Sequence, residues 1–155
     1  MSDKYHSSLE ICKRHAERLT WAMTELKNHF PFTPESLEKF SNTEQAIVDQ
    51  FSTRFAKLQD AMGVNLFPAV LELMKEPPHL TAFLDRLYQL EKIGAIASAE
   101  HWLLLREMRN QFAHDYPEDP QLQSSLLNKA YGLAKDLMVV LQQVEDFVSS
   151  RSISS

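Results

Sequence analysis

Apolar side chains recur every three or four residues along most of this 155-residue chain. The clearest run lies near the start and alternates steps of four and three: Tyr5, Leu9, Cys12, Ala16, Leu19, Met23, Leu26 and Phe30. This spacing places the apolar residues in one stripe along an α-helix. Strand-and-turn folds and glycine-lined phosphate loops need more glycine than the three present here. The pattern therefore predicts an all-α fold whose first long helix ends at Pro31.

Local start signals divide the next part of the chain. Thr33-Pro34 reads as a cap followed by proline at the first helical position, and it predicts a short helix. The segment 41–44, with Ser41 and Glu44 at its ends, matches a capping box that opens a second long helix. Gly63 and Pro68 interrupt the apolar stripe of this helix, which nevertheless continues to Met74. We expect a kink there and not a stop.

The second half of the chain contains three further helices. Pro77-Pro78 is a firm break, and the helix after it ends near Gly94. Ser98 caps the next helix, and Asp119-Pro120 opens the last one. The connections are short, so consecutive long helices should run in opposite directions. The expected fold is an antiparallel, up-and-down bundle of four long helices plus a short one.

Length and composition place this bundle in a single domain over residues 1–148, followed by a frayed, serine-rich tail at 149–155. The formal net charge of -5 argues against a general nucleic-acid coat protein, but it leaves room for a local phosphate site. No segment approaches the ~20 apolar residues of a membrane span, and no secretion signal is recognisable. Cys12 is the only cysteine. We expect a cytoplasmic protein without a membrane anchor.

The best candidates for catalytic residues lie at the end of the fourth long helical segment, in the stretch 109–116, Arg-Asn-Gln-Phe-Ala-His-Asp-Tyr. On an ideal helix, Arg109 falls at the border of an apolar arc made by Leu104, Leu105, Met108 and Phe112. An arginine there needs an acceptor. It can meet an anion, pair with a carboxylate across the bundle, or extend its stem to solvent.

Arg109 and His114 suit phosphate chemistry because one is a permanent planar cation and the other titrates near pH 6.5. Asn110 could orient a phosphate or a ribose hydroxyl. On an ideal helix, however, Arg109 and His114 point roughly 140° apart. They can act on one atom only if the helix end unwinds or if a two-fold dimer places a second copy opposite the first.

Arg109, His114 and Tyr116, with Asn110 directly after the arginine, resemble the R-x4-H-x-Y motif of the HepT-like branch of the HEPN superfamily. The all-helical pattern and the segment 98–102 before the motif are similar as well. The resemblance implies a metal-independent endoribonuclease that needs no cofactor, forms a homodimer and acts as the toxin of a toxin–antitoxin pair. His114 would be the general acid or base, Arg109 would stabilise the transition state, and Asn110 would help to position the phosphate.

The resemblance also implies a partner, an MntA-like minimal nucleotidyltransferase that silences the toxin by adding AMP to Tyr116. A bulky anion two residues from His114 would obstruct an RNA phosphate. Similar proteins are also described as non-catalytic, substrate-binding subunits of such a transferase. A third alternative is a structural helical dimer in which Arg109 is only an ion-pair partner.

Other candidate residues have simpler interpretations. Cys12 lies on the apolar stripe of the first helix and is expected in the core. Three histidines share that helix with Lys13, Arg14 and Arg18. This clustering predicts that one side of the helix is positively charged and solvated, with RNA contact as the alternative. Glu76 and His79 have the spacing of a di-iron ligand pair, but two prolines separate them and no second copy exists, so no metal site is expected. Trp21 and Trp102 are expected to pack in the core or in an interface.

Overall fold

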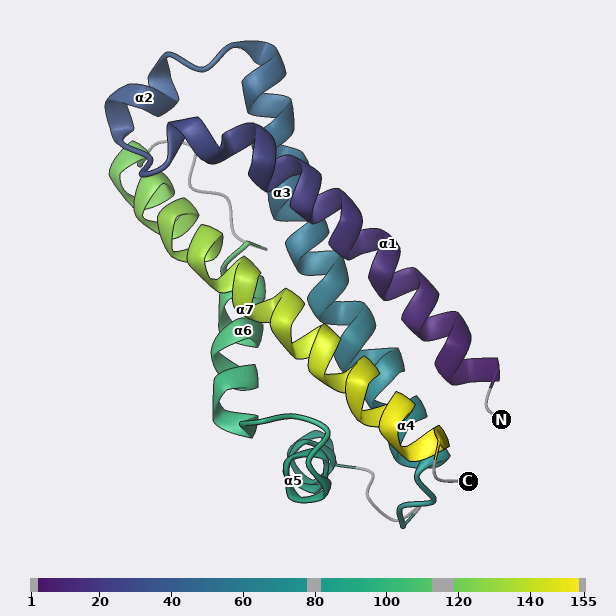
Figure 1. Cartoon of the computed structure of the whole chain (residues 1–155). Coiled ribbons are helices and arrows are strands. Elements are labelled where there is room, and N and C mark those ends of the chain that lie inside the picture. Colours follow the sequence, from purple (N-terminus) through teal and green to yellow (C-terminus); the bar gives the residue numbers. More distant parts are fainter. Residues whose placement is uncertain (1–2, 78–81, 113–118, 154–155) are drawn as a thin grey trace.

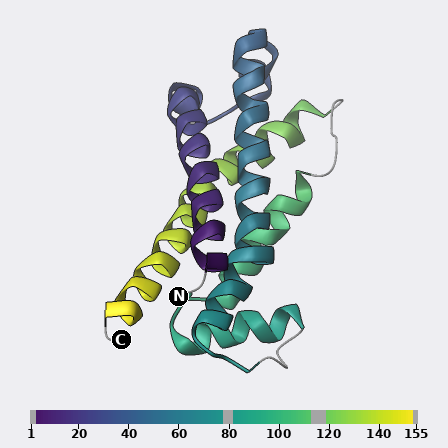
Figure 2. The same cartoon turned by 90° about the vertical axis from the view of Figure 1, so that its right-hand side faces the viewer.

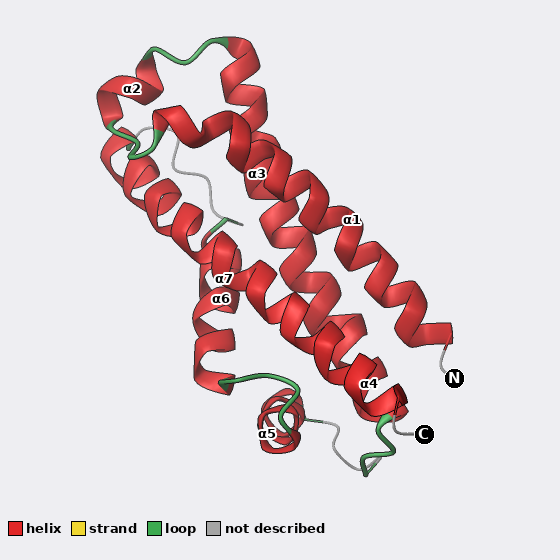
Figure 3. Cartoon of the chain, viewed as in Figure 1, coloured by secondary structure: helices red, strands yellow, loops and turns green. Residues whose placement is uncertain are grey.

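The computed structural model describes residues 3–77, 82–112 and 119–153, and within these ranges the regular structure is entirely helical (Figures 1 and 3). The all-α prediction is confirmed. The elements are α1 (Asp3–Leu26), a 3-10 turn (Lys27–His29), α2 (Pro34–Glu38), α3 (Asn42–Ala61), a π turn (Met62–Leu66), α4 (Phe67–Leu73), α5 (Phe83–Ile93), α6 (Ala99–Gln111) and α7 (Pro120–Ile153). None of the described helices is both long and apolar enough to cross a membrane.

Four long segments form the bundle: α1, α3 continued by α4, α6, and α7. The helix that carries Arg109 is therefore the third long segment and not the fourth, because α5 is an additional short helix outside the bundle. The sequence colours in Figure 1 show that successive segments run in alternating directions. The short helix α2 lies at one end, beside the start of α7. Helix α5 departs from the bundle direction. It is seen end-on in Figure 1 and runs across the lower end of the bundle in Figure 2. It packs against both α4 and α6.

Side-chain caps set the helix starts where the sequence predicts them. The Ser41 hydroxyl accepts a hydrogen bond from the Glu44 backbone N–H at 3.1 Å, and the Glu44 carboxylate accepts the Ser41 N–H at 2.9 Å. Thr33 caps α2, with Pro34 at its first position. The Ser98 hydroxyl accepts the His101 N–H at 3.0 Å and so opens α6. These contacts satisfy N–H groups that have no partner within the helix.

The expected irregularity near Gly63 and Pro68 is a π turn. The chain stays helical from Asn42 to Leu73, and the Phe67 N–H bonds to the Met62 carbonyl across one residue more than in an α-helix. The wide turn lies just before Pro68, whose ring has no N–H to donate and crowds the carbonyl four residues earlier. The helix continues through this irregular turn without a break.

The core runs along the facing sides of α1, α3, α4, α6 and α7. Its largest enclosed side chains include Phe51, Phe55, Phe67 and Trp102. Cys12 is fully buried, and burial raises the pKa of its thiol to about 12. It is therefore a core residue, as predicted. Trp21 is 51% exposed and lies outside the core.

Hydrogen bonds attach the connection after α1 to the first half of α7. The Asn128 side chain accepts the Phe32 N–H at 2.7 Å and donates to the Phe32 carbonyl at 2.9 Å. The Tyr131 hydroxyl donates to the Met23 carbonyl at 3.1 Å. The Asn128 contacts satisfy the backbone N–H and carbonyl of Phe32 in the connection, and the Tyr131 contact joins the last turn of α1 to α7.

Helix α7 continues through Ile153, past residue 149, where the sequence predicts the start of a frayed tail. Phe147 and Val148 are buried, so the helix still has an apolar side to pack at this point. The Ser150 hydroxyl donates to the Phe147 carbonyl, and the Arg151 guanidinium lies 4.6 Å from the Phe147 ring centre. Serine-rich composition alone does not end a helix that retains such contacts.

Two glycines in the described helices make a matched pair for a stability test. Gly94 ends α5 with φ of 89°, a left-handed conformation, whereas Gly132 lies within α7, and a Cβ there would meet nothing within 4 Å. We expect Gly132→Ala to raise the free energy of unfolding by about 0.5–1 kcal/mol, and Gly94→Ala to lower it by about 1 kcal/mol. Urea unfolding monitored by circular dichroism measures both. Equal shifts in the same direction would contradict the assigned backbone geometry.

His15 makes stability depend on pH. Its pKa is lowered, first by burial and then by three nearby cations, Arg54, Lys57 and Arg14. The unfolded chain, with a histidine pKa near 6.5, therefore binds this proton more readily than the folded chain. The contribution of His15 is fully present above about pH 6.5 and is lost as pH falls through the lowered folded pKa.

Urea unfolding at a series of pH values from about 7.5 to 5 tests this dependence. The wild type should lose more unfolding free energy over this range than His15→Gln, which keeps an acceptor but does not titrate. NMR titration of the His15 ring gives the direct check. A folded pKa at or above about 6.5 would contradict the prediction.

Candidate functional site

Helix α6 positions the candidate site through its buried side. Trp102, Leu105 and Met108 are buried, so Arg109 is at the border of the apolar side with 30% of its side chain exposed. Asn110 follows on the exposed side. Leu104, which we expected on the apolar arc, is 57% exposed. It is about 100° from Leu105, the centre of the buried side, and no described helix covers it.

Arg109 forms a two-point ion pair with Asp60 of α3. Its Nε donates to Asp60 Oδ1 at 2.7 Å, and its Nη2 donates to Oδ2 at 2.9 Å. The hydrogen bond to Asp60 is the main cause that raises the pKa of Arg109. Among the alternatives for this arginine, the structure shows pairing with a carboxylate across the bundle. The pair uses Nε and Nη2, so the contact with Asp60 does not engage Nη1.

A groove of about 340 Å³ surrounds this ion pair. Its walls come from α3, the π turn, α5 and α6, and it is lined by Gln59, Asp60, Gly63, Val64, Phe83, Arg86, Arg106, Arg109 and Asn110. We call it the arginine groove. Its described lining contains three arginines, Arg86, Arg106 and Arg109, and one carboxylate, Asp60. The groove therefore suits an anion with several oxygens, such as a phosphodiester.

One wall of the groove combines charge with an aromatic surface. The Arg106 guanidinium lies 4.4 Å from the centre of the Phe83 ring. This stacking holds a cation beside an apolar face, and its strength at a partly exposed site is about 0.5–1 kcal/mol. Arg106 precedes Asn110 by four residues on α6, so both lie on the same side of the helix. The groove thus offers donors for an anion and a flat apolar surface next to them.

Two of the four residues that the sequence singles out lie outside the described residues. His114 and Tyr116 fall in the segment 113–118, so the structure brings together only Arg109 and Asn110. The described part of α6 ends at Gln111, with Phe112 as its C-terminal cap. The angle of roughly 140° between Arg109 and His114 assumes a helix that continues to residue 114, whereas the described helix ends at Gln111.

The sequence analysis did not assign several residues of the groove to a site, among them Asp60, Phe83 and Arg86. A carboxylate partner for Arg109 was one of its alternatives, but many acidic residues were equally possible. Asp60 precedes Arg109 by 49 positions, and only the packing of α3 against α6 selects it. Phe83 and Arg86 come from α5, whose crosswise direction no local signal reveals.

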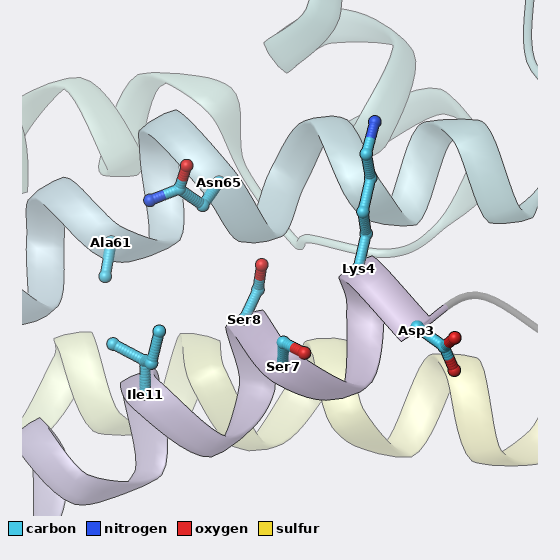
Figure 4. A pocket seen from close by; sticks show the side chains of 7 residues that line it. All are labelled: Asp3, Lys4, Ser7, Ser8, Ile11, Ala61 and Asn65. Carbon is cyan, nitrogen blue, oxygen red and sulfur yellow. The ribbon is translucent and has the colours of Figure 1, made fainter.

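The described part of the chain has further hollows, whose linings differ from that of the groove. One of about 450 Å³ lies between the first turns of α1 and the end of α3 with its π turn (Figure 4). It is lined by Asp3, Lys4, Ser7, Ser8, Ile11, Ala61 and Asn65. Lys4 pairs with Glu72 at 3.5 Å, and both side chains are largely exposed. Within the described ranges, no cluster of three or more histidine, cysteine or acidic residues is arranged to hold a metal ion.

Comparison of the chain with protein-family models, with curated proteins and with solved structures found no match in any of the three. The resemblance of its motif to the HepT-like family therefore stays a prediction.

The Arg109–Asp60 pair should make a measurable contribution to stability. A double-mutant cycle with Asp60→Ala and Arg109→Ala is expected to give a coupling energy of about 0.5–1 kcal/mol, because the pair is two-pointed but partly exposed. The Lys4–Glu72 pair, with exposures of 75% and 63%, is a control and should give a value near zero. Equal coupling energies in the two cycles would show that the Arg109–Asp60 pair stabilises the fold no more than an exposed ion pair does.

Proposed function

We propose that this chain is a metal-independent endoribonuclease of the HepT-like kind, working as a homodimer. The proposal combines the motif formed by Arg109, Asn110, His114 and Tyr116 with one structural observation. This is the convergence of Arg86, Arg106, Arg109 and Asn110 on a single groove at the end of α6. The motif histidine and tyrosine follow this helix end directly in the sequence.

Each residue has a distinct role in the proposed reaction. The ribose 2′-hydroxyl attacks the adjacent phosphorus, the bond to the 5′-oxygen breaks, and a 2′,3′-cyclic phosphate and a 5′-hydroxyl result. His114 transfers the proton, accepting it from the 2′-hydroxyl or donating it to the leaving oxygen. Arg109 stabilises the negative charge that develops on the phosphoryl oxygens. Asn110 helps to orient the phosphate.

Asp60 has two opposing effects in this scheme. Its carboxylate fixes the direction of the Arg109 guanidinium, and a fixed donor needs no reorganisation when charge develops. The same negative charge weakens the attraction of the groove for a phosphate. An RNA phosphate would therefore bind to the Arg109 face that Asp60 leaves uncovered, with Arg106 and Arg86 as further cations.

The proposed regulation acts through Tyr116. A minimal nucleotidyltransferase of the MntA-like kind would join the Tyr116 oxygen to the α-phosphorus of ATP and release pyrophosphate. The added AMP carries a negative charge and a base, and it would compete with RNA beside His114. This partner, with the chain as toxin and the transferase as antitoxin, completes the proposed toxin–antitoxin system in the cytoplasm.

One observation favours a second candidate, the non-catalytic binding subunit of such a transferase. The arginine expected to act on phosphate is already held by a carboxylate. In this alternative, Arg109 and Asp60 only join α6 to α3, and the chain presents Tyr116 or a bound nucleotide to its partner. The two candidates differ in what removal of Asp60 should do.

Cleavage of a labelled RNA in the presence of EDTA tests the proposed function. We expect activity in the wild type and a loss of ~10² or more in Arg109→Ala and in His114→Ala. Asp60→Asn is the matched control, because it breaks the ion pair but keeps the guanidinium. Under the proposal, Asp60→Asn should bind RNA more tightly than the wild type, because a negative charge is removed, and should lose less cleavage activity than Arg109→Ala, because the guanidinium remains but is less firmly oriented.

The other outcomes are equally clear. Equal cleavage by the wild type and both alanine variants would assign the activity to a contaminant and contradict the proposal. Equal loss in Asp60→Asn and Arg109→Ala, with all variants folded by circular dichroism, would reduce Arg109 to a structural partner. No cleavage, together with a stable complex with the minimal nucleotidyltransferase, would support the binding subunit instead.

A further inference from the structure

A second cluster of cations lies on α1 and α3, away from the arginine groove. These helices lie side by side in both views (Figures 1 and 2). The cluster consists of Arg14, His15 and Arg18 from α1 and Arg54 and Lys57 from α3, and we call it the basic face. Arg14 and Arg18 are one helical turn apart, as are Arg54 and Lys57, so each pair points to one side of its helix.

A hydrogen bond joins the two halves of the basic face. Arg54 Nη1 lies 2.9 Å from His15 Nδ1. A guanidinium has only donors, so His15 Nδ1 must be the acceptor and carries no proton. The Arg54 Nε is enclosed and has no hydrogen-bond partner among the described residues. The imidazole therefore satisfies part of Arg54 without neutralising its charge.

The charges of this face are not balanced locally. In the described part of the chain, Arg14, Arg18 and Lys57 have no carboxylate within 4 Å, while Lys4, Lys13 and Arg109 each have one. After burial, the charges that lower the pKa of His15 all come from cations: Arg54, Lys57 and Arg14. Glu10 and Glu17 lie one helical turn from Arg14 on α1, so the four permanent cations of the face outnumber the two carboxylates beside them, in a chain whose net charge is -5. Such a concentration attracts a polyanion.

An aromatic ring lies at one end of the basic face. Trp21 follows Arg18 by three residues and Arg14 by seven, so it shares their side of α1, and it is 51% exposed. Cations beside an exposed aromatic ring are the combination that binds single-stranded nucleic acid, with phosphates on the cations and a base on the ring. An acidic protein segment would use the cations but would gain less from the ring.

The basic face leads toward the arginine groove. Lys57 precedes Asp60 by three residues on α3, and Asp60 holds Arg109 of α6. One helical turn therefore separates the last cation of the face from the ion pair in the groove. A strand whose phosphate lies in the groove can continue across α3 onto α1.

We propose that the basic face binds a stretch of single-stranded nucleic acid, with phosphates on Arg14, Arg18, Arg54 and Lys57 and a base stacked on Trp21. The bound strand is RNA under the proposed function, on which this part of the inference rests. The face then serves as a second site for the substrate beyond the cleavage groove. It selects strands long enough to reach both places.

The test uses a labelled single-stranded RNA of about 15 nucleotides with 2′-O-methyl riboses, which lacks the attacking hydroxyl. Its binding is therefore independent of cleavage, and the proposed ribonuclease activity can fail without affecting the result. Fluorescence anisotropy compares wild type with the triple variant Arg14→Gln, Arg18→Gln and Lys57→Gln. The matched control is Lys39→Gln, Lys92→Gln and Lys129→Gln, which removes the same charge from exposed positions elsewhere.

We expect the face variant to bind at least about tenfold more weakly than wild type at low salt, and the control to stay within about twofold. Each lost phosphate contact should reduce the slope of log affinity against log salt by about 0.7, so the three substitutions together should reduce it by about 2. Trp21→Ala should weaken binding by roughly fivefold or more through lost stacking.

Three results would overturn the inference. The first is no binding of this RNA by the wild type. The second is an equal loss of affinity in the face variant and the control, which would reflect net charge alone. The third is tighter binding of poly-glutamate than of RNA, without dependence on Trp21, which would assign the face to acidic proteins.

Discussion

The packing of α6 against the helical stretch formed by α3 and α4 determines where the candidate site lies. Trp102 is almost fully buried, its ring centre lies 4.6 Å from that of Phe67, and a Cβ added at Gly63 would lie 3.5 Å from its ring. Tryptophan has the largest side chain of all amino acids, so burial of the Trp102 ring here has a strong effect on the position of α6. Arg109, two turns further along α6, then meets Asp60, one turn before Gly63. The site is a consequence of this core contact.

Charge is unevenly distributed over the molecule, and this matters more than its negative total. Three arginines surround the groove on α5 and α6, and further cations occupy α1 and α3. Asp60 lies between these two groups and binds one member of the first. A polyanion that approaches this side of the bundle meets local fields that the net charge does not describe. The bound carboxylate sets the orientation of Arg109 but also reduces its attraction for an anion.

Helix starts could be predicted because capping contacts are local. Capping contacts form at the three helix starts that the sequence predicts, between Ser41 and Glu44, between Thr33 and Ser36, and between Ser98 and His101. The irregular turn near Gly63 and Pro68 was also correctly placed, since proline affects the helical turn directly before it. The predicted tail from residue 149 differs from the observed helix because buried Phe147 and Val148 still support α7 there. Local composition did not reveal that tertiary contact.

By itself, the sequence determined the helical class, the starts of the capped helices, the burial of Cys12 and the position of Arg109 at the edge of an apolar side. These properties depend on spacings of three to seven residues, which the helix repeat converts directly into faces. Only the tertiary structure decided that Asp60 is the partner of Arg109, that α5 crosses the end of the bundle, and that Arg86 and Phe83 reach the groove. Those contacts join residues far apart in the sequence. They depend on how helices pack, and no spacing within a single helix encodes that packing.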